Sequence, residues 1–262
     1  MSRVGVATRM GFREQRRRPL LVVLLVGLPF FFITRAIAVT QRLPRQIGLP
    51  AGGHVLTNMR DVHGAVMAAI TVSFLSGLVG VFVMQSVRQA DRRLVVAGFR
   101  PLEVLVPRVL VLGAASALVL VVSVAVTALS FRPELWLAFV AGNLLVGLIY
   151  AMLGALAGAV VGGLGATYLM LFGAMLDLGI AQNPMFGTGS PPAWGALLPG
   201  YGPGRVIVDA AFSGRFHAWG ALAVSLGWAL VLVAGVMVVL GRAVTVDSRV
   251  RTSAALHRRS RD

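Results

Sequence analysis

The chain has 262 residues, of which 57% are hydrophobic and 13% are charged, and its mean hydropathy is +0.85. A soluble globular protein has roughly 45–50% apolar and about 25% charged residues. This chain has too few polar residues to cover a folded surface in water. The composition therefore predicts an integral membrane protein and excludes a soluble globular fold.

All 24 basic residues are arginine, and the sequence contains neither lysine nor cysteine. The missing lysine excludes a Schiff-base lysine and a Walker A loop, so the chain is not expected to bind ATP through a P-loop of its own. The missing cysteine excludes disulfides and thiolate metal sites, and the four histidines lack metal-ligand spacing. No catalytic, cofactor-binding or metal-binding residue is predicted, and the chain is not expected to be an enzyme.

A net charge of +15 could indicate a nucleic-acid partner, but the positions of the arginines do not support one. They form short clusters between long apolar runs, as in multi-pass membrane proteins. We therefore predict contact with membrane lipid and not with nucleic acid. Arginine in place of lysine, with abundant Ala, Gly and Val, is typical of a GC-rich bacterial genome and points to the bacterial cytoplasmic (inner) membrane.

Residues 1–18 form a basic N-terminal segment. On a helical wheel most of its arginines share one arc, which predicts an amphipathic helix on the anionic cytoplasmic leaflet. A simple topology signal is the alternative. The apolar run after this segment, ending in Ala36-Ile37-Ala38, also resembles a signal peptide with its cleavage site.

Six apolar segments are long enough to cross a bilayer, which takes about 20 residues in a helix. An uncharged run over 135–176 would be roughly 63 Å long as one helix, about twice the hydrocarbon thickness. It is therefore predicted to be two spans, broken at the glycines of 162–165. The other predicted spans cover 19–38, 63–87, 104–130 and 217–241.

The distribution of arginines orients these spans. With six spans both termini share one side, which carries 17 arginines, and the other side carries 7. The positive-inside rule places both termini in the cytoplasm. The predicted architecture is an all-α, six-span membrane domain over 19–241, followed by an arginine-rich cytoplasmic tail over 242–262.

Two loops are informative. After span two, a helix is predicted to continue from Arg88 to Ala97 and to end at Gly98, and Pro101 is suited to open the next helix. This basic loop is either a docking element for a cytoplasmic partner or a solvated loop that fixes topology. Before span six, the Pro- and Gly-rich external loop contains an apolar stretch, 206–212, which is too short to span and is predicted to be a re-entrant helix.

Within the spans, Gly154, Gly158 and Gly162 recur every four residues, which predicts close helix packing. Asp177 is the one carboxylate placed inside a predicted span. Carboxylates at depth are costly and are often functional. The alternative is that Asp177 already reaches the outer headgroups.

This layout resembles the permease subunits of ABC transporters of the type-2 exporter family over nearly the whole chain. Leu198-Pro199-Gly200-Tyr201 resembles the proline-containing stretch before span six of that family, and 92–103 resembles its loop after span two. Asp91-Arg92-Arg93 stands where many members have Glu-Arg, and no Gly-Thr-Leu follows. The same loop also resembles that of FtsX-like permeases, but the loop over 39–62 is too short for their external domain.

The resemblance implies a separate ATPase subunit that supplies ATP, and a second permease subunit in a homo- or heterodimer. It implies export of a lipid, drug-like or glycan cargo. A non-transporting membrane scaffold or accessory subunit is the alternative. The loop after span two would dock the ATPase through the residues Arg88, Arg92, Arg93, Gly98, Phe99, Arg100, Pro101 and Glu103. Spans two and five would line the substrate path, with candidate residues Phe74, Phe82, Phe172, Met175 and Asp177.

Overall fold

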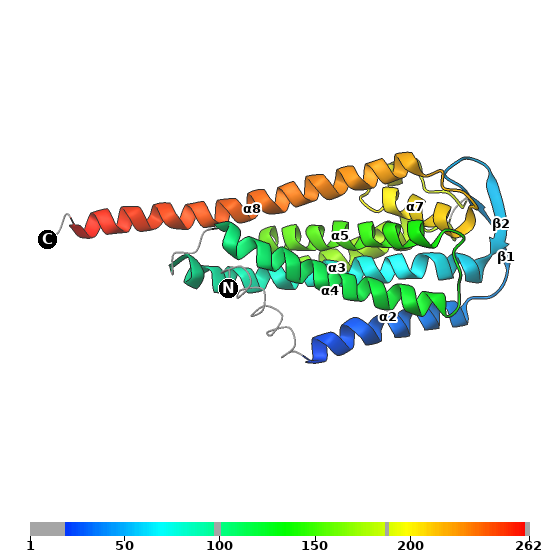
Figure 1. Cartoon of the computed structure of the whole chain (residues 1–262), viewed down its shortest axis with the longest axis horizontal. Coiled ribbons are helices and arrows are strands. Elements are labelled where there is room, and N and C mark those ends of the chain that lie inside the picture. Colours follow the sequence, from blue (N-terminus) through cyan, green and yellow to red (C-terminus); the bar gives the residue numbers. More distant parts are fainter. Residues whose placement is uncertain (1–18, 97–100, 187–188, 260–262) are drawn as a thin grey trace.

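The computed structural model describes residues 19–96, 101–186 and 189–259, and the chain is 76% helical. Its long helices run back and forth along one axis and form a bundle (Figure 1). The elements in chain order are α2 (Pro19–Val39), β1 (Pro44–Gly48), β2 (His54–Asn58), α3 (Met59–Val96), α4 (Pro101–Ala128), α5 (Trp136–Val160), α6 (Gly163–Ala174), the π-helix η1 (Met175–Ala181), the 3-10 helix η2 (Ala193–Leu197), α7 (Tyr201–Phe212) and α8 (Trp219–Arg259).

Within the described residues, four helical segments are long and apolar enough to cross a membrane. They are Met59–Gln85, Trp136–Val160, Gly163–Ala181 and Trp219–Val239. The mostly helical membrane fold predicted from composition is confirmed at this level. The count of six spans, the side on which the termini lie and the re-entrant segment stay predictions, and residues 1–18 lie outside the described residues.

The predicted break in the long uncharged run is confirmed. α5 ends at Val160 and α6 begins at Gly163, and Gly162 between them has a φ of +86°. This left-handed conformation is open to glycine and strained for other residues. The chain therefore reverses at Gly162, and α5 and α6 pack beside each other.

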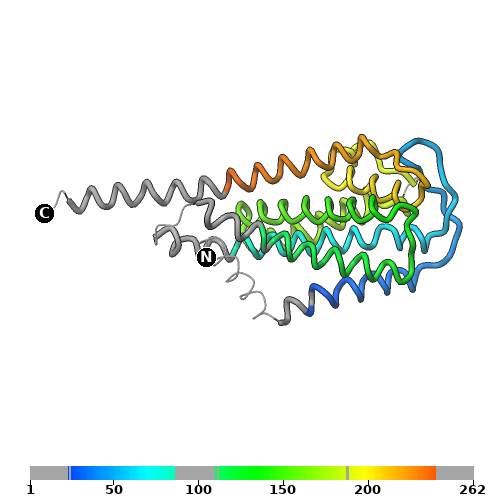
Figure 2. The backbone as a smooth tube through the Cα atoms, in the orientation of Figure 1, coloured from blue at the N-terminus to red at the C-terminus, as the bar shows by residue number. Residues whose placement is uncertain are grey.

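The loop over 39–62 contains an element that the apolar pattern did not predict, a two-stranded antiparallel hairpin of β1 and β2. Gly52 and Gly53 form its turn with φ of +89° and +79°. The hairpin lies at the same end of the bundle as α7 (Figure 2). It is fixed there by Ile47, whose side chain is fully buried against Val62 and Val208.

Polar contacts also hold the hairpin in place. The guanidinium Nη1 of Arg205 on α7 donates a hydrogen bond to the Gly48 carbonyl at 3.1 Å, and the Gly48 amide donates to the Gly189 carbonyl at 3.0 Å. Burial lowers the pKa of Arg205 below its ordinary value. At the end of β2, Asn58 caps α3, because its Oδ1 accepts a hydrogen bond from the Asp61 amide at 3.0 Å.

Candidate functional site

A buried carboxylate joins three parts of the bundle. Asp177 lies in η1 with 4% of its surface exposed. Its Oδ2 accepts hydrogen bonds from the Tyr150 hydroxyl of α5 at 2.6 Å and from the Gly200 amide at 2.8 Å. Its Oδ1 accepts one from Gln182 Nε2 at 3.2 Å. One side chain thereby connects α5, the π-helix and the residue that precedes α7.

The segment before α7 is fitted closely to this carboxylate. A Cβ added at Gly200 would lie 2.7 Å from Asp177 Oδ1, so the close approach requires glycine here. Gln182 Nε2 also donates to the Gly195 carbonyl at 2.9 Å. The segment before α7 is therefore anchored from inside the bundle at two points, Gly195 and Gly200.

Asp177 was interpreted from sequence as either a substrate-path residue or a residue among the headgroups. The structure places it in the interior of the chain with three donors. π-helical turns inside membrane-facing helices are rare and are often found at functional sites. In this chain the π-turn points the Asp177 carboxylate toward Tyr150 and Gly200, which lie 27 and 23 residues away in sequence.

The other substrate-path candidates lie on neighbouring elements but in different environments. Phe82 of α3, Phe172 of α6 and Met175 of η1 are all exposed, at 47%, 60% and 53%. Phe74 is partly buried against the core. The three exposed residues can therefore contact lipid, cargo or a second subunit, whereas Asp177 is enclosed within this chain.

The predicted docking residues within the described part of the chain lie on two helices, α3 and α4. Arg88, Arg92 and Arg93 lie on α3, which continues as one helix to Val96. The helix that was predicted to continue from Arg88 is therefore the last part of α3. Pro101 and Glu103 lie in the first turn of α4, as predicted. Three predicted docking residues lie outside the described residues: Gly98, Phe99 and Arg100.

The glycine pattern on α5 meets a matching pattern on α3. A Cβ at Gly154 would lie 2.0 Å from the Gly77 carbonyl oxygen, and a Cβ at Gly80 would lie 2.1 Å from the Ala151 carbonyl oxygen. A Cβ at Gly158 would lie 3.2 Å from the Val81 carbonyl oxygen. Sequence analysis did not identify Gly77 and Gly80 as the other half of this contact.

Gly162 is not a packing residue, contrary to its assignment with Gly154 and Gly158. A Cβ at Gly162 would meet no atom within 4 Å. The residue stands after the end of α5, where the chain turns, so the four-residue period of the stripe no longer places it on the α3-facing side.

A second buried carboxylate, Asp209 of α7, was missed. It is fully buried, and its Oδ2 accepts hydrogen bonds from the His217 and Ala218 amides at 2.7 and 3.0 Å. Its Oδ1 accepts one from the Ser213 hydroxyl at 2.9 Å. Asp209 fixes the turn between α7 and α8 and lies near the positive N-terminal end of α8. An Asp inside a short apolar run, four residues before a Ser, was the available signal.

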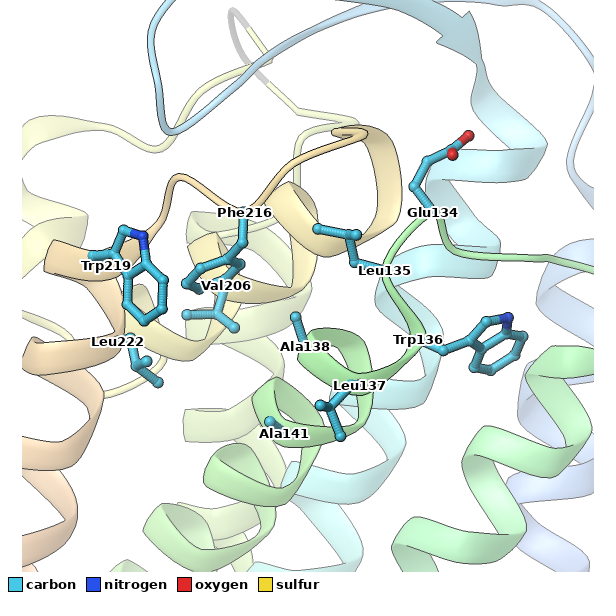
Figure 3. Close-up of a pocket in the computed structure, with 10 residues that line it drawn as sticks. All are labelled: Glu134, Leu135, Trp136, Leu137, Ala138, Ala141, Val206, Phe216, Trp219 and Leu222. Carbon is cyan, nitrogen blue, oxygen red and sulfur yellow. The ribbon is translucent and has the colours of Figure 1, made fainter.

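An open apolar groove of about 600 Å³ lies between the first turns of α5 and α8, with α7 behind it (Figure 3). Phe216, Trp219 and Leu222 form the α8 side, and Leu137, Ala138 and Ala141 belong to α5. Glu134 is the one charged residue that lines it, at the end where α5 begins. The groove can accept an apolar group with one polar end.

No cluster of three or more metal-ligating His, Asp or Glu side chains occurs among the described residues. Comparisons of the chain with protein-family models, with curated proteins and with solved structures find no match.

Proposed function

We propose that this chain is the membrane-embedded permease subunit of an ATP-driven exporter of the type-2 ABC kind, powered by a separate ATPase subunit. Its cargo would be a lipid, drug-like or glycan molecule moved out of the bacterial cytoplasm. The missing lysine supports a separate ATPase, because a chain without lysine has no Walker A loop.

The observation that carries the proposal is the length of α3. The uncharged run of α3 ends at Val87, and the helix continues nine residues further to Val96 with three arginines. The chain then returns into α4 after only four residues. A basic helix end joined to the next helix by a link of four residues can transmit force between a bound partner and the bundle.

The proposed orientation has six spans with both termini in the cytoplasm. α2 and α4 would be the two further spans, since they contain the apolar segments Leu25–Val39 and Leu112–Ala128. The hairpin and α7, at the opposite end of the bundle from the end of α8, would form the external side, with α7 as the re-entrant helix. The excess of arginines near the other end supports this assignment.

Topology reporters test the orientation. Fusions after Arg100 and Arg251 should report a cytoplasmic position, and fusions at Gly52 in the hairpin turn and at Gly189 should report an external one. The expectation follows from the 17 to 7 distribution of arginines. A cytoplasmic signal at Gly189 would contradict the proposed number of spans.

Charge reversal tests the docking role. The double variant Arg92→Glu, Arg93→Glu should weaken binding of the ATPase subunit at least about tenfold, because like charges across an interface cost several kcal/mol. Gly98→Val should uncouple ATP hydrolysis from transport or block assembly. The measurement is the amount of ATPase that copurifies and its ATP hydrolysis in the reconstituted complex.

Arg132→Glu is the matched control, since Arg132 is exposed in the link between α4 and α5. This control should assemble like the unaltered chain. If the Arg92/Arg93 variant also binds its ATPase and supports transport normally, the docking assignment is wrong. A scaffold or accessory subunit is then the better interpretation of the chain. An ATPase gene beside the gene for this chain would favour the exporter.

The substrate path would lie where two permease subunits pair, along α3 and α6. The exposed Phe82, Phe172 and Met175 supply an apolar surface for that pairing or for the cargo. The second subunit is either another copy of this chain or a related permease.

A further inference from the structure

We propose that the groove between α5 and α8 binds one acyl chain of a membrane lipid whose ammonium headgroup lies at Glu134. The proposal requires that the chain is embedded in a membrane, and it goes beyond the transport role. The groove lies between α5, α7 and α8, so it is separate from the proposed substrate path on α3 and α6.

The position of the groove along the bundle matches the acyl region just below the headgroups. α5 and α8 each begin with a tryptophan, Trp136 and Trp219, with 40% and 67% of their surface exposed. Tryptophan at helix ends marks the water–lipid interface. From Trp136 to Ala141 the groove extends about 7.5 Å along α5, at a rise of about 1.5 Å per residue.

The apolar lining of the groove favours a hydrocarbon chain as the ligand. Its volume of about 600 Å³ is in the range of small-molecule sites, roughly 300–1,000 Å³. Such sites usually carry several polar groups that orient the ligand. Here small and aromatic side chains face each other: Ala138 and Ala141 leave room, and Phe216 packs edge-to-face on Trp219 with ring centroids 4.8 Å apart.

The groove is held open by α7. The Leu135 amide donates to the Ala210 carbonyl at 2.9 Å, which ties the start of α5 to α7. Asp209 on the same helix accepts the amides at the start of α8. α5 and α8 are therefore fixed to the same short helix, and neither can move across to fill the space between them without breaking these bonds.

Charge at the rim selects the headgroup. Glu134 is exposed and is the one charged side chain in the lining. Arg132, two residues before it, and Arg215, next to Phe216, are also exposed. The ammonium of a zwitterionic headgroup can pair with the Glu134 carboxylate, whereas an anionic glycerol headgroup would leave the carboxylate without a cation.

The test uses the full chain in vesicles without any ATPase, so its outcome is independent of the transport proposal. The probes are phosphatidylethanolamine and phosphatidylglycerol, each with a photoreactive group within one acyl chain. Label should be recovered on the peptides that contain residues 134–141 and 216–222, and more of it with the ethanolamine lipid. Ala141→Phe should reduce this labelling to the level at the exposed Leu169 and Leu230, because the added ring fills the groove.

The matched control is Ala223→Phe, at an exposed alanine of α8 outside the groove, which should leave labelling unchanged. Glu134→Gln should reduce the preference for ethanolamine by up to about fivefold, the equivalent of an exposed ion pair of about 1 kcal/mol. Labelling of the groove that is no stronger than at Leu169 and Leu230, or that survives Ala141→Phe, would mean non-specific annular lipid and would overturn the site. An unchanged preference in Glu134→Gln would overturn the headgroup assignment.

Discussion

Alanine in place of Gly154 should disrupt the contact between α3 and α5, at the centre of the bundle. The new methyl carbon would lie 2.0 Å from the Gly77 carbonyl oxygen, and the nearest atoms all belong to backbone, which cannot rotate away. The two helices must move apart, and the buried side chains around them lose contact. We expect a loss of about 1–3 kcal/mol in the free energy of unfolding, the range for overpacked cores.

Gly173→Ala is the matched control for this variant. Gly173 is a helical glycine of α6, and a Cβ there would meet no atom within 4 Å. Alanine should be neutral or stabilising at this position by up to about 1 kcal/mol, because it has the higher helix propensity. Thermal unfolding of the purified variants in detergent measures both effects. Equal unfolding temperatures for Gly154→Ala and Gly173→Ala would contradict the packing argument.

The glycine contact illustrates what the sequence could and could not predict. A small-residue stripe on one helix predicts close packing, but it does not identify the partner helix. Gly77 ends a small-residue stripe of α3 with the same four-residue period, which begins Ala65, Ala69 and Ser73. Glycine alone was considered from sequence, on α5, and neither stripe identifies the other as its partner. The helices themselves were predictable, because each membrane span is a continuous run of apolar residues in the sequence.

The elements at the hairpin end of the bundle were harder to predict, since their stability comes from contacts between distant segments. The hairpin of β1 and β2 has polar residues on both strands, and its one fully buried side chain, Ile47, packs on residues from α3 and α7. Gly52-Gly53 was the local turn signal. Two of the three donors to Asp177 lie 27 and 23 residues away, a separation that no local pattern encodes.

Removing the Asp177 carboxylate should destabilise the fold before it alters any transport property. Asp177→Leu would leave three buried donors without an acceptor: the Tyr150 hydroxyl, the Gly200 amide and one N–H of Gln182. Each buried donor left unpaired costs about 1–3 kcal/mol. We therefore expect a loss of about 3 kcal/mol or more in the free energy of unfolding.

Asp177→Asn should have a smaller effect that follows from the same geometry. If the new amide keeps its oxygen toward Tyr150 and Gly200, its NH₂ faces the NH₂ of Gln182. The Gln182 Oε1 atom has no hydrogen-bond partner in the structure, so the Gln182 amide can turn and accept a hydrogen bond from the NH₂ of the new amide with this atom. The hydrogen bond from Gln182 Nε2 to the Gly195 carbonyl is then lost. The expected loss is that of one buried hydrogen bond, about 1–2 kcal/mol.

Glu134→Gln is the matched control, because it makes the same change of charge at an exposed carboxylate. Thermal unfolding in detergent should rank the variants with Asp177→Leu lowest, Asp177→Asn and Tyr150→Phe intermediate, and Glu134→Gln equal to the unaltered chain. The order arises because the carboxylate acts as the acceptor that holds α5, η1 and the start of α7 together. If Asp177→Asn unfolds at the same temperature as Glu134→Gln but changes the cargo preference of the proposed exporter complex, Asp177 faces the proposed substrate path and is not a structural anchor.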